Sequence, residues 1–258
     1  MLTNALPLAL GMLLASASAP DSGTTRRAAV DAEDVLAKTR AAYAALTSYA
    51  DSGTVLDEVT GFTDRSTFRT LFLRDPRYLL IEYRAVASEY KSGYRLPLNS
   101  HIVLWMENGE LQTWHSRTQA HETYSADGGQ QVNALKSSAY GTAGISVLIP
   151  SHLYGKSGLA SAVHATEEPE ADGFEPVNGR RCFRILGVER WRYPSGQVTG
   201  VRPITLWIDA ETFLIHKIIQ DTPKGMPRGS IGRRTTIIKH QANPELEPAQ
   251  FRFAVPAS

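Results

Sequence analysis

Seven histidines and one cysteine are the side chains of this 258-residue sequence that most readily support metal or acid–base chemistry. The only close grouping is His115, His121 and Glu122. On one continuous strand, residues six apart share a face but lie about 20 Å apart, too far to bind one metal ion. A loop between the two histidines would remove this objection, so a metal site is the weaker interpretation. The other histidines are scattered, and we expect neither a metal site nor a cofactor.

Sequence motifs for nucleophilic or nucleotide chemistry are absent. The sequence has no G-x-S-x-G, no phosphate-binding G-x-x-x-x-G-K-[ST] and no G-x-G-x-x-G. Cys182 stands in an apolar stretch and is interpreted as a small buried residue rather than a reactive thiol. The acidic run 167–170 is interpreted as a solvated turn. We therefore expect no catalytic residues and no enzyme. Catalytic groups converge in space rather than in sequence, so a hydrolase stays open as the weakest interpretation of the function.

The composition is that of an ordinary globular protein. Hydrophobic residues make up 42% of the chain, and 27 basic against 26 acidic residues leave a net charge of +1. A general nucleic-acid binder needs a basic field to displace counterions, so this balance argues against nucleic acid as a partner. A single cysteine also excludes an intrachain disulfide.

The first 17 residues have the pattern of an export signal. Ala5–Ala15 is an apolar run without a charge, and Ala15-Ser16-Ala17 fits the small-x-small pattern before a cleavage site. A buried N-terminal helix is the alternative, which Pro7 and Gly11 inside the run disfavour. We expect cleavage after Ala17 and a monomeric periplasmic protein, soluble once residues 1–17 are removed.

Residues 18–30 would then form a linker and residues 31–258 a single domain. Apolar residues at three- and four-residue spacing predict an amphipathic helix over Asp31–Ser48, with Asp31 as its N-cap. Short segments rich in β-branched and aromatic residues follow, separated by turn residues. The predicted strands are 50–60, 64–74, 77–88, 101–107, 110–116, 118–124, 182–190, 202–209, 213–221, 233–241 and 250–253.

These elements predict an α+β fold with one strongly curved antiparallel sheet. Asn108-Gly109 between two apolar segments is a strong two-residue hairpin signal. The segment 144–155 interrupts the strands and suits a short helix that Pro150 kinks or divides. The sheet would be an incomplete β-barrel, with helices covering its concave face.

The predicted strands carry many large apolar side chains, and a curved sheet with few helices can enclose a pocket instead of filling it. Apolar residues at alternate strand positions would line a cavity of roughly 300–1,000 Å³. The candidate ligand-binding residues are Phe68, Phe72, Ile81, Leu104, Leu148, Ile149, Leu206 and Trp207.

Four features in order resemble the periplasmic lipoprotein-carrier (LolA-like) superfamily. The first helix leads into Tyr49–Gly53, and Phe72–Pro76 is similar to the family's strand ending in Arg-Pro. Leu104–Gly109 is similar to its strand–turn hairpin. The late strands over Ile204–Ile218 and the ending Phe251–Pro256, similar to F-x-F-x-x-P, complete the resemblance. It spans most of the chain and indicates a divergent relative rather than the housekeeping carrier.

The resemblance implies a half-barrel that holds lipoprotein acyl chains or another apolar ligand, with membrane-bound partner proteins. In the family, an arginine at the Arg-Pro motif hydrogen-bonds to a lid and helps to hold it shut. Arg74 matches that position, but Asp75 intervenes before Pro76, a one-residue shift that would turn a strand side chain to the opposite face. Arg77 is therefore a rival candidate for the lid contact.

Three functions stay open at this point. The first is a carrier or sensor of an apolar ligand. The second is a protein-interaction module that uses the sheet face, as in the LolA-like domain of the regulator RseB. The third is the hydrolase. Whether the segment 144–155 is a lid or a fixed core helix is also open, because its apolar face predicts burial in both cases.

Overall fold

The computed structural model describes residues 30–107, 109–125, 127–154, 163, 166–192, 198–222 and 231–256. The predicted signal peptide and all but the last residue of the predicted linker lie outside these ranges, as does Asn108.

Eleven strands and four α-helices are formed by the described residues. The strands are β1 (Ser48–Val59), β2 (Phe62–Leu73), β3 (Tyr78–Tyr90), β4 (Arg95–Glu107), β5 (Glu110–His115), β6 (Ala120–Tyr124), β7 (Thr166–Val177), β8 (Arg180–Arg192), β9 (Val198–Asp209), β10 (Ile215–Asp221) and β11 (Ile231–Ala242). The helices are α1 (Ala32–Ala45), α2 (Gly128–Gly141), α3 (Ile145–Leu148) and α4 (Pro150–Tyr154), followed near the C-terminus by the 3-10 turn η1 (Pro248–Phe251).

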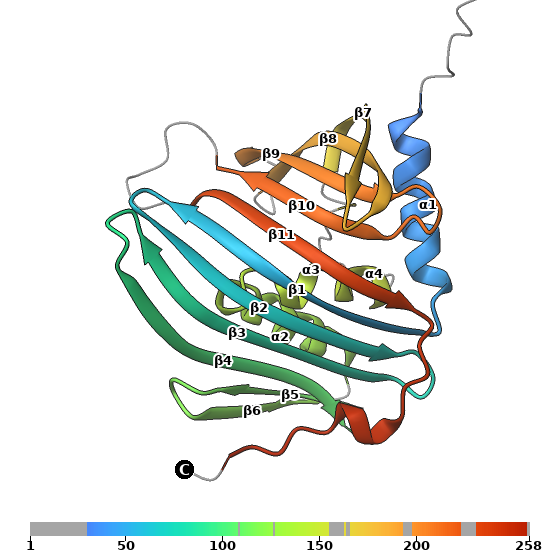
Figure 1. Cartoon of the computed structure of the whole chain (residues 1–258). Coiled ribbons are helices and arrows are strands. Elements are labelled where there is room, and N and C mark those ends of the chain that lie inside the picture. The colour runs from blue at the N-terminus through green and yellow to red at the C-terminus, as the bar shows by residue number, and fades with distance from the viewer. Residues whose placement is uncertain are drawn as a thin grey trace, which may run out of the picture.

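All the described strands belong to one sheet in the order β6-β5-β4-β3-β2-β1-β11-β10-β9-β8-β7. Every pairing is antiparallel, and β6 and β7 are the two edges, so the sheet is open. Figure 1 shows it curving around α2, α3 and α4. This confirms the predicted α+β class and the incomplete barrel.

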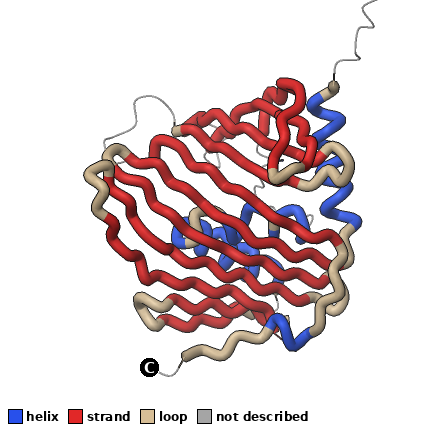
Figure 2. The backbone as a smooth tube through the Cα atoms, in the orientation of Figure 1, coloured by secondary structure: helices blue, strands red, loops and turns tan. Residues whose placement is uncertain are grey.

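The helices lie on one side of the sheet, which we call the helix-covered face (Figure 2). Helix α1 begins as predicted, because the Asp31 carboxylate accepts the Glu33 N–H at 3.0 Å. Its apolar stripe is buried through Val35, Leu36 and Tyr43, and the helix contacts both α4 and β7. One large buried cluster therefore joins all four helices to the sheet.

Proline divides the mid-chain helical segment as expected, since α3 ends at Leu148 and α4 begins at Pro150. Helix α2, however, forms in a part of the interruption for which no helix was predicted. The acidic run 167–170 lies in the edge strand β7, not in a turn. Glu167 and Glu168 form ion pairs with Arg190 of the neighbouring strand β8, and charge at a sheet edge discourages further pairing.

The predicted strand 250–253 is wrong. Pro248 begins the 3-10 turn there, and Phe251 is buried on the outer face of the sheet with Leu80 and Trp105. An apolar side chain at the end of such a turn can be buried by packing onto a sheet without joining its hydrogen-bond ladder.

Candidate functional site

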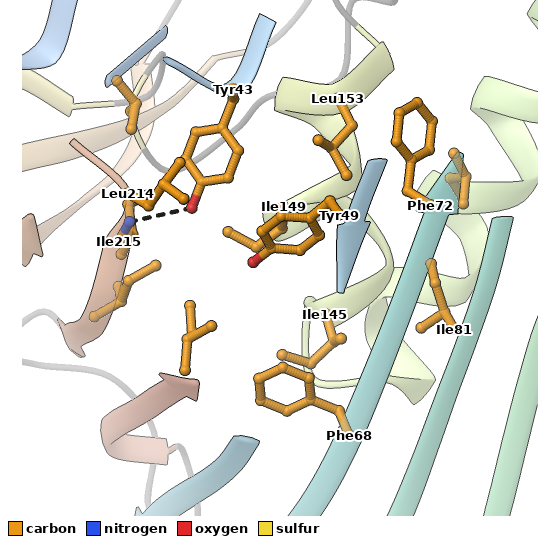
Figure 3. Packing of buried hydrophobic residues seen from close by; sticks show 14 of the residues in the cluster. Tyr43, Tyr49, Phe68, Phe72, Ile81, Ile145, Ile149, Leu153, Leu214 and Ile215 are labelled. Carbon is orange, nitrogen blue, oxygen red and sulfur yellow. Dashed lines mark hydrogen bonds between the residues drawn. The ribbon is translucent and has the colours of Figure 1, made fainter. Parts of the chain in front are cut away.

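Most of the candidate ligand-binding residues meet on the helix-covered face. Figure 3 shows Phe68, Phe72 and Ile81 on the sheet opposite Ile149 of the helical segment, all within one buried cluster. Leu148 packs against this cluster but is only half-buried. The members of the cluster that were predicted from the sequence are Phe68, Phe72, Ile81, Leu104, Ile149 and Leu206.

Trp207 does not join this group. It packs with Val177 and Cys182 in a separate cluster, and its ring lies 4.1 Å from the Lys217 ammonium. Consecutive strand residues point to opposite faces, so Trp207 cannot share a lining with its neighbour Leu206. The cysteine is fully buried as expected, and burial raises the pKa of its thiol to about 11.

A buried polar group lies within the apolar cluster. The Tyr49 hydroxyl donates to Asp51 at 2.9 Å, and the Tyr43 hydroxyl accepts the Ile215 N–H at 3.1 Å. Burial raises the pKa of Asp51 to about 7, although the hydrogen bond from Tyr49 opposes the shift. Sequence analysis missed this group. The available signal was Asp51 two residues after Tyr49, which places a carboxylate on the apolar side of the strand.

Arg74 holds the end of α4 and the end of α1 together, a contact we call the α4 anchor. Its guanidinium donates to the carbonyl oxygens of Leu46 at 2.7 Å, Leu153 at 3.2 Å and Tyr43 at 3.3 Å. The expected turn to the opposite face does not occur, because β2 ends at Leu73 and strand alternation no longer applies. Arg74 makes the hydrogen bond to Leu153 of the helical segment, the role for which Arg77 was the rival candidate.

A second arginine holds the other end of the helical segment, a contact we call the α3 anchor. Arg234 donates to both oxygens of Asp57, at 2.6 and 2.7 Å, and to the Ala143 carbonyl oxygen at 3.1 Å. Asp57 and Arg234 are cross-strand partners of β1 and β11. Nothing in the sequence indicated this pair, because its members are 177 residues apart.

The two largest described pockets lie away from the apolar cluster's centre. One of about 660 Å³ is lined by Asp209, His216 and His240 among others, and one of about 540 Å³ by the turn 74–78 with parts of β4 and α2. The candidate apolar residues line neither of them. Their side chains pack against each other and against the helices, so the expected apolar cavity is filled by side chains in the described part of the chain.

The histidine grouping of the sequence falls on the hairpin of β5 and β6. His121 stacks on Trp105 with ring centroids 5.5 Å apart and hydrogen-bonds to Gln112 at 2.9 Å. Within the described ranges, no three His, Cys, Asp or Glu side chains are placed to hold a metal ion. No helix of the described residues is long and apolar enough to cross a membrane.

Structural comparison finds similar architectures at low sequence identity. The lipoprotein LppX of Mycobacterium tuberculosis is 13% identical with a TM-score of 0.44, covering 84% of this chain and 99% of that one. In the MucA/MucB complex of Pseudomonas aeruginosa, the matching chain is 17% identical with a TM-score of 0.44, and the match covers 87% of this chain and 62% of that one. A LolA superfamily protein from Nitrosomonas europaea is 11% identical with a TM-score of 0.29, and the match covers 87% of this chain and 99% of that one.

No protein-family model and no curated protein sequence matches the chain. At such identities and TM-scores the likeness concerns the fold alone, and function must be argued from the chain's own residues. The open curved sheet with helices on its concave face is the arrangement that the sequence resemblance predicts.

Proposed function

We propose that this protein is a periplasmic carrier or sensor that binds an apolar ligand, such as lipoprotein acyl chains, between the sheet and the α3–α4 segment (Ile145–Tyr154). The α4 anchor is the observation that carries this proposal. Arg74 closes the end of α4 with a single hydrogen bond to Leu153, and it reaches only backbone carbonyls there. Such a contact can open and reform without breaking an ion pair.

The face beneath the segment supplies the surface that an acyl chain needs. Ile145, Ile149 and Leu153 bury their side chains against Phe68, Phe72 and Ile81 of the sheet (Figure 3). Burying these aliphatic side chains removes apolar surface from water, so exposing them in water has a cost. An acyl chain that replaces these contacts would offset that cost, and the segment would act as the lid.

A fluorescent fatty-acid analogue tests the proposal directly. We expect saturable binding with a negative heat-capacity change, the signature of apolar burial. Ile149→Ser should lower the free energy of unfolding by less than about 1.5 kcal/mol, since a lid belongs to the low-stability part of a fold, and should accelerate probe release. Val201→Ser, at an exposed outer position, is the control and should change neither quantity.

Two results would count against the carrier. Absence of probe binding would rule out the carrier function. A decrease of about 2–4 kcal/mol in the free energy of unfolding of Ile149→Ser, with an unchanged rate of probe release, would identify a fixed core helix. The second candidate is then the protein-interaction module. The exposed side chains of Tyr90, Tyr94 and Leu96 on the β3–β4 hairpin favour it. Pulldown of a stable partner by protein whose native mass shows no lipid would support this function.

A further inference from the structure

The pocket of about 540 Å³ lies directly beside the α4 anchor. The turn Arg74–Tyr78 forms one wall, and Met106, Gly109 and Gln131 form the other. Gln131 of α2 is held in place by donating to the Gly109 carbonyl oxygen at 2.7 Å. The pocket therefore joins the end of β2, the β4–β5 turn and the start of α2.

This pocket adjoins the apolar interior. Met106 is a member of the buried cluster on the helix-covered face. Arg74 lines the pocket and also holds Leu153 of α4. A ligand whose chain lay under the α3–α4 segment could therefore place its end group here.

The described residues that line the pocket carry a net positive charge. Arg74 and Arg77 line it together, opposed by the single carboxylate of Asp75. Burial, and then the positive charge of Arg77, lower the pKa of Arg74, so the two guanidinium groups repel each other. An anion between them would relieve this repulsion. Guanidinium groups bind carboxylate and phosphate in bidentate geometry, with bonds about twice as strong as neutral hydrogen bonds.

We propose that this pocket binds the anionic end group, a carboxylate or phosphate, of the carried acyl ligand. The anion competes with the Leu153 carbonyl for Arg74 and so releases the end of α4. The inference rests on the proposed function and adds the ligand class and the trigger for opening. Gln131 can donate to the same oxyanion if its side chain leaves Gly109.

Displacement of a bound neutral fluorescent probe by three competitors tests the inference. The competitors are a long-chain alcohol, the fatty acid of equal length and its lysophosphatidic acid, with inorganic phosphate as the chain-free arm. We expect both anionic lipids to bind at least about fivefold more tightly than the alcohol, as expected for a gain of charge-assisted hydrogen bonds. Inorganic phosphate should not displace the probe.

Charge variants locate the effect. Arg77→Gln should lower the affinity for the anionic lipids about fivefold and leave the affinity for the alcohol unchanged. Asp75→Asn should raise the affinity for the anionic lipids about twofold, because it removes a solvent-screened charge of the same sign as the ligand's. Arg95→Gln, an arginine on the distant β3–β4 hairpin, is the matched control and should leave all three affinities unchanged. Circular dichroism should confirm that each variant is folded.

Equal affinity for alcohol and anionic lipids, or no response to Arg77→Gln in a folded variant, would overturn the inference and leave the proposed carrier intact. Displacement by inorganic phosphate would also overturn it, since the site would then recognise a free anion instead of a ligand's end group. If the neutral probe itself does not bind, the proposed function has failed, and the inference fails with it.

Discussion

Two arginines hold the α3–α4 segment against the sheet, one at each end, and they differ in what balances their charge. Arg234 of the α3 anchor pairs with both oxygens of Asp57, and both side chains are largely buried. Arg74 of the α4 anchor donates to three carbonyl oxygens and, within the described residues, forms no ion pair with a carboxylate.

The difference assigns the two ends different roles. The Asp57 ion pair fixes the Arg234 guanidinium on the sheet, so the hydrogen bond to Ala143 comes from a side chain that is held in place. Arg74, by contrast, can exchange the Leu153 carbonyl for another acceptor at little cost. We therefore expect the α3 end to stay on the sheet as a hinge while the α4 end opens. Ala143, which accepts the Arg234 bond, has a positive φ of 51°, and Gly144 follows with 82°. A fixed turn at the hinge suits these conformations.

The largest effect is expected at the α3 anchor. Arg234→Ala leaves Asp57 buried without its partner and should lower the free energy of unfolding by about 3–5 kcal/mol. Chemical denaturation of both proteins measures this. The double variant Arg234→Met with Asp57→Leu should recover much of the loss, because it removes the buried charge altogether. A loss below about 1 kcal/mol for Arg234→Ala would show that this pair behaves like a surface ion pair.

Asp51 should make the α4 side sensitive to pH. Its folded pKa of about 7 lies above the ordinary value of 3.8, so its contribution to stability is complete below pH 4 and is lost as pH rises through 7. A shift of this size corresponds to on the order of 4 kcal/mol. We assign this pH dependence to the α4 end of the segment. The ring of Tyr49, which bonds to Asp51, lies 5.9 Å from the ring of Tyr43, and the Tyr43 carbonyl oxygen accepts a hydrogen bond from Arg74.

Asp51→Asn isolates this effect. The free energy of unfolding, measured from pH 4 to 8, should fall with pH more steeply in the wild type than in the variant. The difference between the two proteins is the relevant quantity, because His240 acts in the opposite direction. Burial lowers the pKa of His240 to about 4, so its contribution grows as pH rises from 4 to 6.5. Parallel pH profiles would contradict the assignment.

Arg74→Ala should have a smaller effect on folding and a clear one on release. Losing the hydrogen bonds to the carbonyl oxygens of three buried residues should cost about 1–3 kcal/mol. If the α4 anchor limits opening, the same energy should speed probe release about tenfold. The stability and the release rate of Arg74→Lys should lie between those of the wild type and Arg74→Ala, since one ammonium cannot span the carbonyls of α1 and α4 as a guanidinium does. Unchanged release in a folded Arg74→Ala would show that the α4 end is not the one that opens.

The smallest effect is expected at Leu148, on α3 near the hinge. This side chain is half-buried, so Leu148→Ser should lower the free energy of unfolding by less than about 1 kcal/mol and leave probe release unchanged. Stopped-flow release beside thermal denaturation measures both quantities. Faster release here than in Arg74→Ala would reverse the assignment of hinge and opening end.

The sequence by itself determined the elements whose signals are local. The Asp31 cap, the apolar stripe of α1, most strands and the break at Pro150 all depend on residues a few positions apart. Strand alternation also indicated which apolar residues of one strand share a face, although the adjacent Leu206 and Trp207 were both assigned to the lining. The open curved sheet followed from these signals.

Only the tertiary structure decided which distant residues meet. Arg74 lies 79 residues from Leu153, and Asp57 lies 177 residues from Arg234, so no local period could relate them. The side chain of Arg74 was assigned by strand alternation, which fails once β2 has ended. Long-range hydrogen bonds depend on where chain reversals place side chains in space, and that is why both anchors and the pocket beside Arg74 became visible only in the folded molecule.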